Sequence, residues 1–214
     1  MSCYDREMYL PQIFTELRPD ILQKLMRDNG FATLVTAADG VPFASHIPVL
    51  IAGDSAAGTV TIRGHVARAN PHWKQLAAGA AVLAIFHGPH CYVSPSWYAE
   101  PENVPTWNYA VVHAYGRAAL LAPDDLRALL KDLVEAHERA FEQPWRFDSL
   151  PASLVDGLLH GIVGFEIVVE RLEGKIKLSQ NRPPDDRRRV RETLAASADP
   201  LARDVAAWMD LLAR

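Results

Sequence analysis

Residues 63–71 have the residue types of a phosphate-binding turn. The segment reads Arg-Gly-His-Val-Ala-Arg-Ala-Asn-Pro and joins a β-prone stretch to the start of a helix. A phosphate group needs positive charge and convergent N–H donors, and arginine beside the first turn of a helix supplies both. Gly64 would let the backbone approach a ligand closely. An exposed strand-to-helix turn with solvated arginines would have the same sequence, so both interpretations stay open.

Two further clusters could contact a ligand. Residues 86–116 hold Trp97 and Trp107, several tyrosines and a proline-rich loop at residues 95–105. Aromatic planes beside short polar groups such as Asn108 suit a flat, partly polar ligand. A rigid loop whose aromatic side chains cap a sheet is the alternative. The segment at residues 177–182 offers amides and two cations, yet such runs are also typical of solvated loops.

Metal and covalent chemistry have less support. The tightest metal-like group among the eight histidines is His87, His90 and Cys91, and no second Cys/His pair stands at zinc-finger spacing. We therefore expect no metal. There is no Gly-x-Ser-x-Gly elbow, and no catalytic residue can be assigned. Cys91 beside His90 could be a nucleophile, but a small buried thiol on a strand is the commoner case.

A basic run at residues 187–191 raises the question of DNA binding by a helix-turn-helix. The last helix, however, carries Leu201, Val205 and Trp208 as a stripe suited to packing. The net charge of −4 and pI of about 6.0 provide no general attraction to nucleic acid. Direct DNA binding is thus the weaker interpretation.

The bulk properties fit a globular, cytoplasmic protein. A chain of 214 residues with 49% hydrophobic and 22% charged residues can bury a substantial core. Its two cysteines do not form a disulfide framework, which fits a reducing cytosol. We find no leader sequence and no apolar run of membrane-spanning length, and we expect no membrane partner.

Turn and helix signals divide the chain into short elements. Asp39-Gly40 predicts a hairpin turn, and Asn70 and Pro71 predict a helix start. Pro42 and Pro48 each remove a backbone donor, so their strand should be an edge, bulged or facing a ligand. Strands are predicted at residues 31–37, 41–51, 59–65, 80–86, 109–121 and 161–172. Helices are predicted at residues 19–28, from residue 71, and at 123–141, 151–160, 184–198 and 200–212.

This order of elements predicts a mainly β protein with peripheral helices. Short strands joined mostly by hairpins favour a small antiparallel barrel, and alternating β-α-β units are absent. We divide the chain into a barrel domain at residues 1–182, with inserted helices, and a C-terminal helical hairpin at residues 183–214, packed on or near the barrel.

Long motifs across the chain resemble one known family. They are Met-Tyr-Leu-Pro at residues 8–11, Gly-His at 64–65 with Arg-Ala-Asn-Pro-His-Trp at 68–73, the stretch 88–98, Asn-Val-Pro-Thr-Trp-Asn-Tyr at 103–109, Gly-Ile-Val-Gly-Phe at 161–165 and residues 177–182. Together they resemble the PaiB-like family of FMN-binding negative transcriptional regulators. The resemblance runs from about residue 8 to residue 182. It implies an FMN-binding split barrel that dimerises with the flavin at the subunit interface.

The resemblance also assigns candidate residues for FMN. It implies that the phosphate is bound at the 63–70 turn, and that residues 45–48 lie along the isoalloxazine ring. Trp107, Asn108 and the 177–182 segment would belong to the same pocket, contributed in part by the partner subunit. The candidate set is Ser45, His46, Ile47, Pro48, Arg63, Gly64, His65, Arg68, Asn70, Trp107, Asn108, Lys177, Ser179, Gln180, Asn181 and Arg182.

Three functions follow from this likeness. The leading hypothesis is an FMN-binding homodimer that acts as a negative transcriptional regulator or redox-linked sensor, with DNA contact that is direct or indirect. The first alternative is a flavin-dependent oxidoreductase, similar to a flavin reductase or pyridoxamine-phosphate oxidase, in which the flavin does the chemistry. The second is a haem-binding or haem-degrading split barrel with His65 or His90 as the axial ligand.

Overall fold

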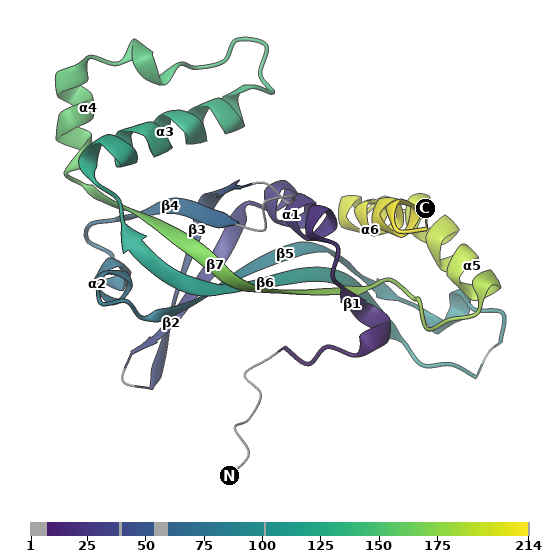
Figure 1. Ribbon diagram of the computed structural model, residues 1–214. Helices are drawn as coiled ribbons and strands as arrows, with labels where there is room; N and C mark the ends of the chain where they lie inside the picture. Colours follow the sequence, from purple (N-terminus) through teal and green to yellow (C-terminus); the bar gives the residue numbers. More distant parts are fainter. Residues whose placement is uncertain (1–7, 39, 54–59, 101, 214) are drawn as a thin grey trace. The chain divides into compact units, whose positions relative to one another are not determined.

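The computed structural model describes residues 8–38, 40–53, 60–100 and 102–213 (Figure 1). Their hydrogen bonds build one antiparallel seven-stranded sheet in the order β1-β7-β4-β3-β2-β5-β6. A further β7–β6 pairing closes six of these strands into a ring. The predicted class, mainly β with peripheral helices, is confirmed.

The elements follow each other in a simple order. The strands are β1 (Thr15–Glu16), β2 (Phe31–Ala38), β3 (Val41–Ala52), β4 (Thr61–Ala67), β5 (Ala81–Val93), β6 (Thr106–Leu120) and β7 (Ile162–Lys177). The helices are α1 (Pro19–Asp28), α2 (His72–Ala77), α3 (Pro123–Glu138), α4 (Ala152–Leu159), α5 (Pro184–Ala195) and α6 (Pro200–Leu211). Short 3₁₀ turns occur at Gln12–Phe14, Pro95–Trp97 and Phe147–Ser149.

The chain forms two compact units. Unit 1 comprises Met1–Asp28, His87–His113 and Glu173–Arg214, and unit 2 comprises Asn29–Phe86 and Ala114–Leu172. Strands β5, β6 and β7 each supply residues to both units. The C-terminal helices α5 and α6 therefore share a unit with the N-terminal segment and the middle of the chain, a grouping that sequence order did not suggest.

Unit 2 is an antiparallel array whose core alternates along each strand. β2 pairs with β3 from Phe31↔Pro48 to Ala38↔Val41, and β4 pairs with β7 from Thr61↔Val168 to Ala67↔Ile162. Its fully buried side chains include Leu34, Ile62 and Phe165. Helix α3 packs on the same unit through Leu126, Leu129 and Leu133, with Leu50, Leu121, Leu130, Leu159 and Ile162 against them.

Unit 1 has its own core beneath three helices. Leu25 and Met26 of α1 are fully buried, as expected from the apolar stripe of this helix, whose predicted bounds are confirmed. Val190 of α5 and Val205 of α6 are also fully buried. Asp186 of α5 accepts a hydrogen bond from the Ala99 amide at 2.8 Å, which attaches the helix to the segment after β5.

Several boundaries differ from the predictions. β5 continues past Pro89 to Val93, and β7 runs to Lys177 instead of ending at residue 172. These extensions pass from one unit to the other, and in β5 the passage falls at His87-Gly88-Pro89, residues typical of a turn, through which the strand nevertheless continues. α3 ends at Glu138 and α5 at Ala195, three residues earlier than expected in each case. The predicted Asp39-Gly40 turn includes Asp39, which lies outside the described residues.

Gly116 and Gly157 provide a matched test of this packing. A Cβ at Gly116 would collide with the Val168 carbonyl oxygen of β7, whereas a Cβ at Gly157 of α4 would meet nothing within 4 Å. Gly116→Ala should lower the free energy of unfolding by about 2 kcal/mol or more, because backbone must shift. Gly157→Ala should raise it by roughly 0.5–1 kcal/mol, because alanine favours a helix. Urea unfolding measures both, and equal effects would contradict the packing described.

Candidate functional site

The residues predicted to bind flavin begin on β3, where this strand has a single neighbour. β3 pairs with β2 along residues 41–48 but pairs with β4 only from Val49 to Ala52. Pro42 and Pro48 both lie in the one-sided part, which confirms the edge predicted from them. Within the described part of the chain, no strand pairs with the backbone on the β4 side of residues 41–48.

Residues 45–48 divide between the two faces of β3. Ser45 and Ile47 are buried, whereas His46 and Pro48 are exposed. The exposed face continues onto β2, where Phe31, the cross-strand partner of Pro48, is 69% exposed. Thr33 Oγ1 lies 3.0 Å from His46 Nδ1 on this face. A flat ligand along β3 could therefore contact His46 and Pro48 directly but not the side chain of Ser45.

The buried face of β3 joins the predicted phosphate turn through a hydrogen-bonded chain. Asn70 Nδ2 donates to Ser45 Oγ at 2.9 Å, and Ser45 Oγ lies 2.9 Å from His72 Nδ1. On the other side of the ring, His72 Nε2 lies 3.0 Å from Thr36 Oγ1, which donates to Gln75 Oε1. Two of the predicted segments, residues 45–48 and 63–70, are thus brought into contact.

The donors in this chain have one consistent orientation. Thr36 uses its proton on Gln75, so it accepts from His72 Nε2–H; Ser45 accepts from Asn70, so its own proton goes to His72 Nδ1. The imidazole of His72 is then neutral. It has no exposed surface, and burial lowers the pKa of His72 below its ordinary value. Phe43 contacts the ring edge-on at a centroid distance of 4.9 Å.

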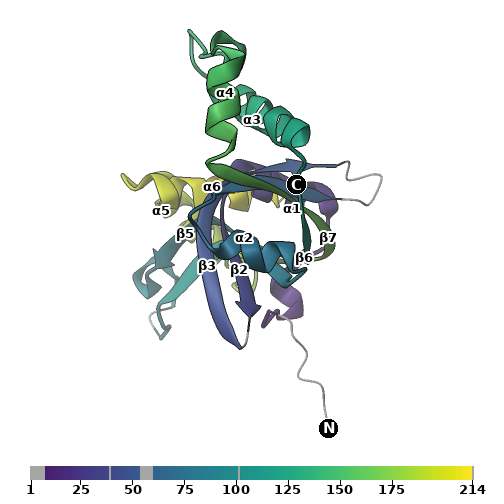
Figure 2. The same cartoon turned by 90° about the vertical axis from the view of Figure 1, so that its left-hand side faces the viewer.

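Sequence reasoning missed the central residue of this network. His72 and Thr36 were not among the candidates, although His72 stands two residues after the predicted cap Asn70. The structure also starts α2 at His72, one residue later than expected. Asn70 still caps it, since its Oδ1 accepts from the His72 amide at 3.0 Å. Figure 2 shows α2 beside β2 and β3, the two strands to which the network attaches it.

Arg63, Gly64 and His65 alternate on β4. Gly64 is on the buried face, where a Cβ would come within 3.0 Å of Phe165 and Val49, so core packing explains this glycine. Arg63 and His65 are on the opposite face. Arg63 forms ion pairs with Asp132 at 3.3 Å and Glu166 at 3.6 Å, so carboxylates already balance its charge.

His65 is in a different situation from Arg63. Its Nδ1 is buried and has no hydrogen-bond partner in the described part of the chain, and burial lowers its pKa. A buried polar atom without a partner has a substantial energetic cost. Because this nitrogen has essentially no accessible surface, a ligand oxygen could reach it only after neighbouring side chains moved.

Arg68 ties the turn to the start of β7. Its Nε donates to the His160 carbonyl at 2.7 Å and its Nη2 to the Ile162 carbonyl at 3.1 Å. Trp73 Nε1 donates to the Arg68 carbonyl at 3.0 Å. Arg68 and Trp73 help to line a cavity of about 410 Å³, and its lining also includes Leu126, Leu159 and the carboxylates of Asp124 and Asp156. No carboxylate of the described residues pairs with Arg68, so its charge remains available to an anion.

The candidates in unit 1 form a second, separate group. Asn108 is fully buried and exchanges hydrogen bonds with Ser179, which has a φ of 63°, an uncommon value for serine. Gln180 closes the same turn by bonding to the Leu178 amide and the Ile176 carbonyl. Trp107 is 53% exposed, with His90 and Tyr92 beside its ring.

The two cationic members of this group contact polar neighbours. Lys177 Nζ donates to Thr106 Oγ1 at 2.5 Å. Arg182 donates to Asn103 Oδ1 at 2.6 Å and stacks on Tyr98. Asn181, which follows Gln180 in the same turn, is exposed.

The geometry gives little support to metal binding or to covalent catalysis by Cys91. In the described ranges, no three His, Cys, Asp or Glu side chains gather as metal ligands. His90 Nδ1 lies 3.2 Å from the Gly88 carbonyl oxygen. Burial, aided by the charge of Asp199, raises the pKa of Cys91 to about 11. A thiol with that pKa is protonated at neutral pH and is a poor nucleophile.

The fold is that of a split barrel, and comparisons with known proteins show that the class is flavin-binding. The family described as "Putative FMN-binding domain" matches residues 8–171. "Protease synthase and sporulation protein PAI 2" of Bacillus subtilis (strain 168) is 39% identical over 203 residues, covering 95% of this chain and 97% of that protein. An uncharacterised protein of Emericella nidulans is 33% identical, covering 84% and 87% of the two chains.

This chain therefore belongs to the PaiB-like FMN-binding family, and FMN is its cofactor. Two solved structures share its fold. The FAD and haem binding protein from Mycobacterium smegmatis has a TM-score of 0.62 at 19% identity, covering 81% of this chain and 78% of that one. The flavocytochrome Anf3 from Azotobacter vinelandii has a TM-score of 0.56 at 14% identity, covering 77% and 69%. Both confirm the predicted split-barrel architecture.

A search of the described helices for membrane spans finds none that is both long and apolar enough.

The buried histidines predict a pH-dependent stability. The folded-state pKa values of His72 and His65 lie below the ordinary value of about 6.5, so the unfolded chain binds more protons as the pH falls through that value. The free energy of unfolding should therefore decrease from pH 7.5 to pH 5. His72→Gln should remove a large part of this decrease, because glutamine cannot be protonated.

Urea unfolding of both proteins at several pH values measures the slope. His137→Gln is the matched control, because His137 is exposed on α3 and this substitution should leave the slope unchanged. If the free energy of unfolding of His72→Gln depended on pH as steeply as that of the wild-type protein, the His72 imidazole would not be the group that titrates.

Proposed function

We propose that this protein is an FMN-binding homodimer that acts as a negative transcriptional regulator or redox-linked sensor. The observation that carries the proposal is the contact between Asn70 and Ser45. It holds the cationic turn after β4 against the one-sided stretch of β3. A ligand with a dianionic phosphate and a planar ring with a polar edge needs these two environments close together.

The phosphate would bind at the turn between β4 and α2. Arg68 supports this because its guanidinium has only carbonyl partners in the described structure. His65 would contribute its partly exposed ring, and Asn70 would shape the turn. Arg63 is already paired with Asp132 and Glu166, so it would add less charge to the phosphate site than Arg68 does, although it lies beside His65 on β4. Because α2 has only six residues, its dipole would contribute less than these side chains.

The isoalloxazine ring would lie along residues 45–48 of β3. His46 and Pro48 offer an exposed wall, Ile47 and Gly64 form the packed layer behind it, and Ser45 anchors the strand. When bound, FMN supplies reversible electron-transfer chemistry. The protein's own contribution would be to bind the phosphate, orient the ring and limit its exposure to water.

A second protomer would complete the site. Phe31 is 69% exposed and Val41 is 68% exposed on the strands that carry this wall, and an apolar surface of this kind favours a covering partner. In the proposal, the partner's copies of Trp107, Asn108 and residues 177–181 form the opposite wall, with Lys177 as its cation. Arg182 lines a different groove, beside α5, and is left out of this wall. Sharing the flavin between subunits would fix the dimer as a symmetric one.

Regulation would be exerted in the cytoplasm and without extensive DNA contact. Half of the basic run on α5 is balanced, because Arg188 pairs with Asp185 and Glu192, and Arg191 pairs with Asp210, whereas Arg187 and Arg189 have no carboxylate partner among the described residues. In a chain with a net charge of −4, such arginines attract DNA weakly at physiological salt. We therefore favour an indirect effect on transcription, signalled by the state of the flavin.

Arg68 provides the decisive test of the cofactor site. Arg68→Met should weaken FMN binding by roughly ten- to a hundredfold, because a charge-assisted contact to phosphate is lost. Riboflavin lacks the phosphate, so its affinity should change less than about twofold. Flavin fluorescence quenching measures both ligands.

Arg117→Met is the matched control, because Arg117 is an exposed arginine that also donates to a backbone carbonyl, that of Gly79. It should leave both affinities unchanged. Equal weakening of FMN and riboflavin by Arg68→Met would place the phosphate elsewhere.

DNA retention tests the regulatory part of the proposal. At physiological salt, the FMN-loaded protein should retain duplex DNA from its own promoter region no better than unrelated duplex DNA in a gel-shift assay. Salt-sensitive and sequence-selective retention would contradict the indirect mechanism and favour direct regulation. Rapid bleaching of the bound flavin by NADH or NADPH would favour the oxidoreductase alternative instead.

A further inference from the structure

We propose that a groove formed by α5, α6 and the segment before α5 binds a compact phosphate-bearing anion of the pyrophosphate class. The groove has a volume of about 550 Å³, within the range of small-molecule sites. Four arginines line it against two carboxylates, an excess of two positive charges in a chain whose net charge is −4. They are Arg182, Arg187, Arg188 and Arg191, with Glu192 and Asp210.

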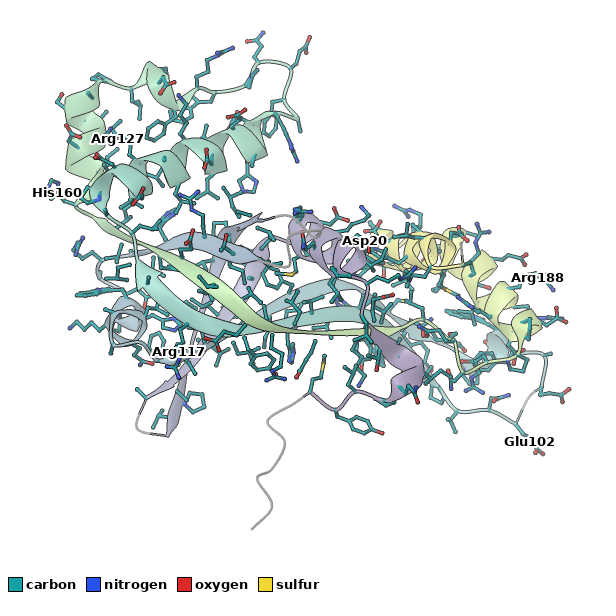
Figure 3. The ribbon with its side chains drawn as sticks, viewed as in Figure 1. Asp20, Glu102, Arg117, Arg127, His160 and Arg188 are labelled. Carbon is teal, nitrogen blue, oxygen red and sulfur yellow. The ribbon has the colours of Figure 1, made fainter. Side chains whose placement is uncertain are left out.

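The arginines differ in how far their charge is already balanced. Arg191 forms a close pair with Asp210, and Arg188, labelled on α5 in Figure 3, pairs with Asp185 and Glu192. Arg187 has no carboxylate partner in the described part of the chain. Arg182 donates only to the neutral oxygen of Asn103. Two guanidinium groups of the groove are therefore available to an anion.

Arg182 is held in place before any ligand binds. Its guanidinium lies over the ring of the buried Tyr98 at 4.3 Å from the centroid, and one of its nitrogens donates to Asn103 Oδ1 at 2.6 Å. A planar group fixed in this way loses little side-chain entropy on binding, and its remaining N–H donors suit two oxygens of one phosphate.

The shape of the groove distinguishes a compact anion from duplex DNA. Arg187 and Arg188 stand four and three residues before Arg191, about one helical turn away. All three line the groove, together with Met209 of α6 and Ala213, which follows α6. A duplex phosphate backbone needs cations spread along a surface, whereas a small diphosphate needs them converging on one point. The apolar floor would accept the organic part of such a ligand.

Isothermal titration of the FMN-saturated protein with inorganic pyrophosphate tests this site. We expect saturable binding with one site per chain. Arg187→Gln should weaken it by roughly tenfold, because one charge-assisted contact is lost. Arg189→Gln is the matched control, because Arg189 is an exposed arginine on the same helix that does not line the groove, and it should change the affinity less than about twofold.

A substitution of opposite sign makes the test sharper. Asp210→Asn should tighten pyrophosphate binding several-fold, because it releases Arg191 and removes a negative charge from the groove. It should not weaken α6, since a negative charge is unfavourable in the last turn of a helix. Thermal unfolding of each variant shows whether the fold is retained.

The pyrophosphate titrations also show whether the groove is distinct from the flavin site. Binding that persists with FMN bound and in Arg68→Met supports a second anion site, whether or not Arg68 holds the flavin phosphate. Absence of saturable binding, or competition between pyrophosphate and FMN, would overturn it. Equal losses of pyrophosphate affinity in Arg187→Gln and Arg189→Gln would also overturn it, because they would indicate non-specific electrostatic attraction to α5. Binding of random duplex DNA would then be weakened equally by the two substitutions.

Discussion

The buried neutral imidazole of His72 is the constraint on which the rest of the candidate site depends. Both of its ring nitrogens are paired inside the protein, one with Ser45 of β3 and the other with Thr36 of β2. Removing either partner would leave a buried polar atom unsatisfied, at a cost of roughly 1–3 kcal/mol. The positions of two strands and of α2 are thus fixed together, so the cationic turn and the one-sided stretch of β3 are already adjacent in the protein without a ligand.

Alternation along β3 and β4 then assigns different tasks to neighbouring residues. The buried face carries Ser45 and Gly64, which serve the network and the core. The opposite face carries His46 and Pro48, which are exposed, and His65, which is partly buried. The prolines shape the candidate site as much as the polar groups do. Residues 42 and 48 have no backbone N–H to donate, so β3 cannot be fully hydrogen-bonded to strands on both sides there.

The sequence was most informative where the structure depends on local signals. The helix at residues 19–28 and the edge at Pro42 and Pro48 follow from periodicity and from missing donors. The continuation of β5 and β7 did not, because Gly88-Pro89 is typical of a turn yet lies inside β5, and Gly174 lies inside the extended part of β7. His72 was overlooked for a similar reason, since a histidine at a helix start reveals nothing about the Ser45 and Thr36 hydroxyls that enclose it. The family resemblance supplied the cofactor, which no local pattern could have identified.

Which arginines can bind a ligand is a property of tertiary structure. Arg63 and Arg68 lie five residues apart in one motif, yet Arg63 is paired with two carboxylates from α3 and β7, while Arg68 contacts only carbonyl oxygens. On α5, the adjacent residues Arg187 and Arg188 differ in the same way. Because a guanidinium without a carboxylate partner retains its charge for an anion, the distribution of acidic residues, more than that of basic ones, decides where an acidic chain can bind phosphate.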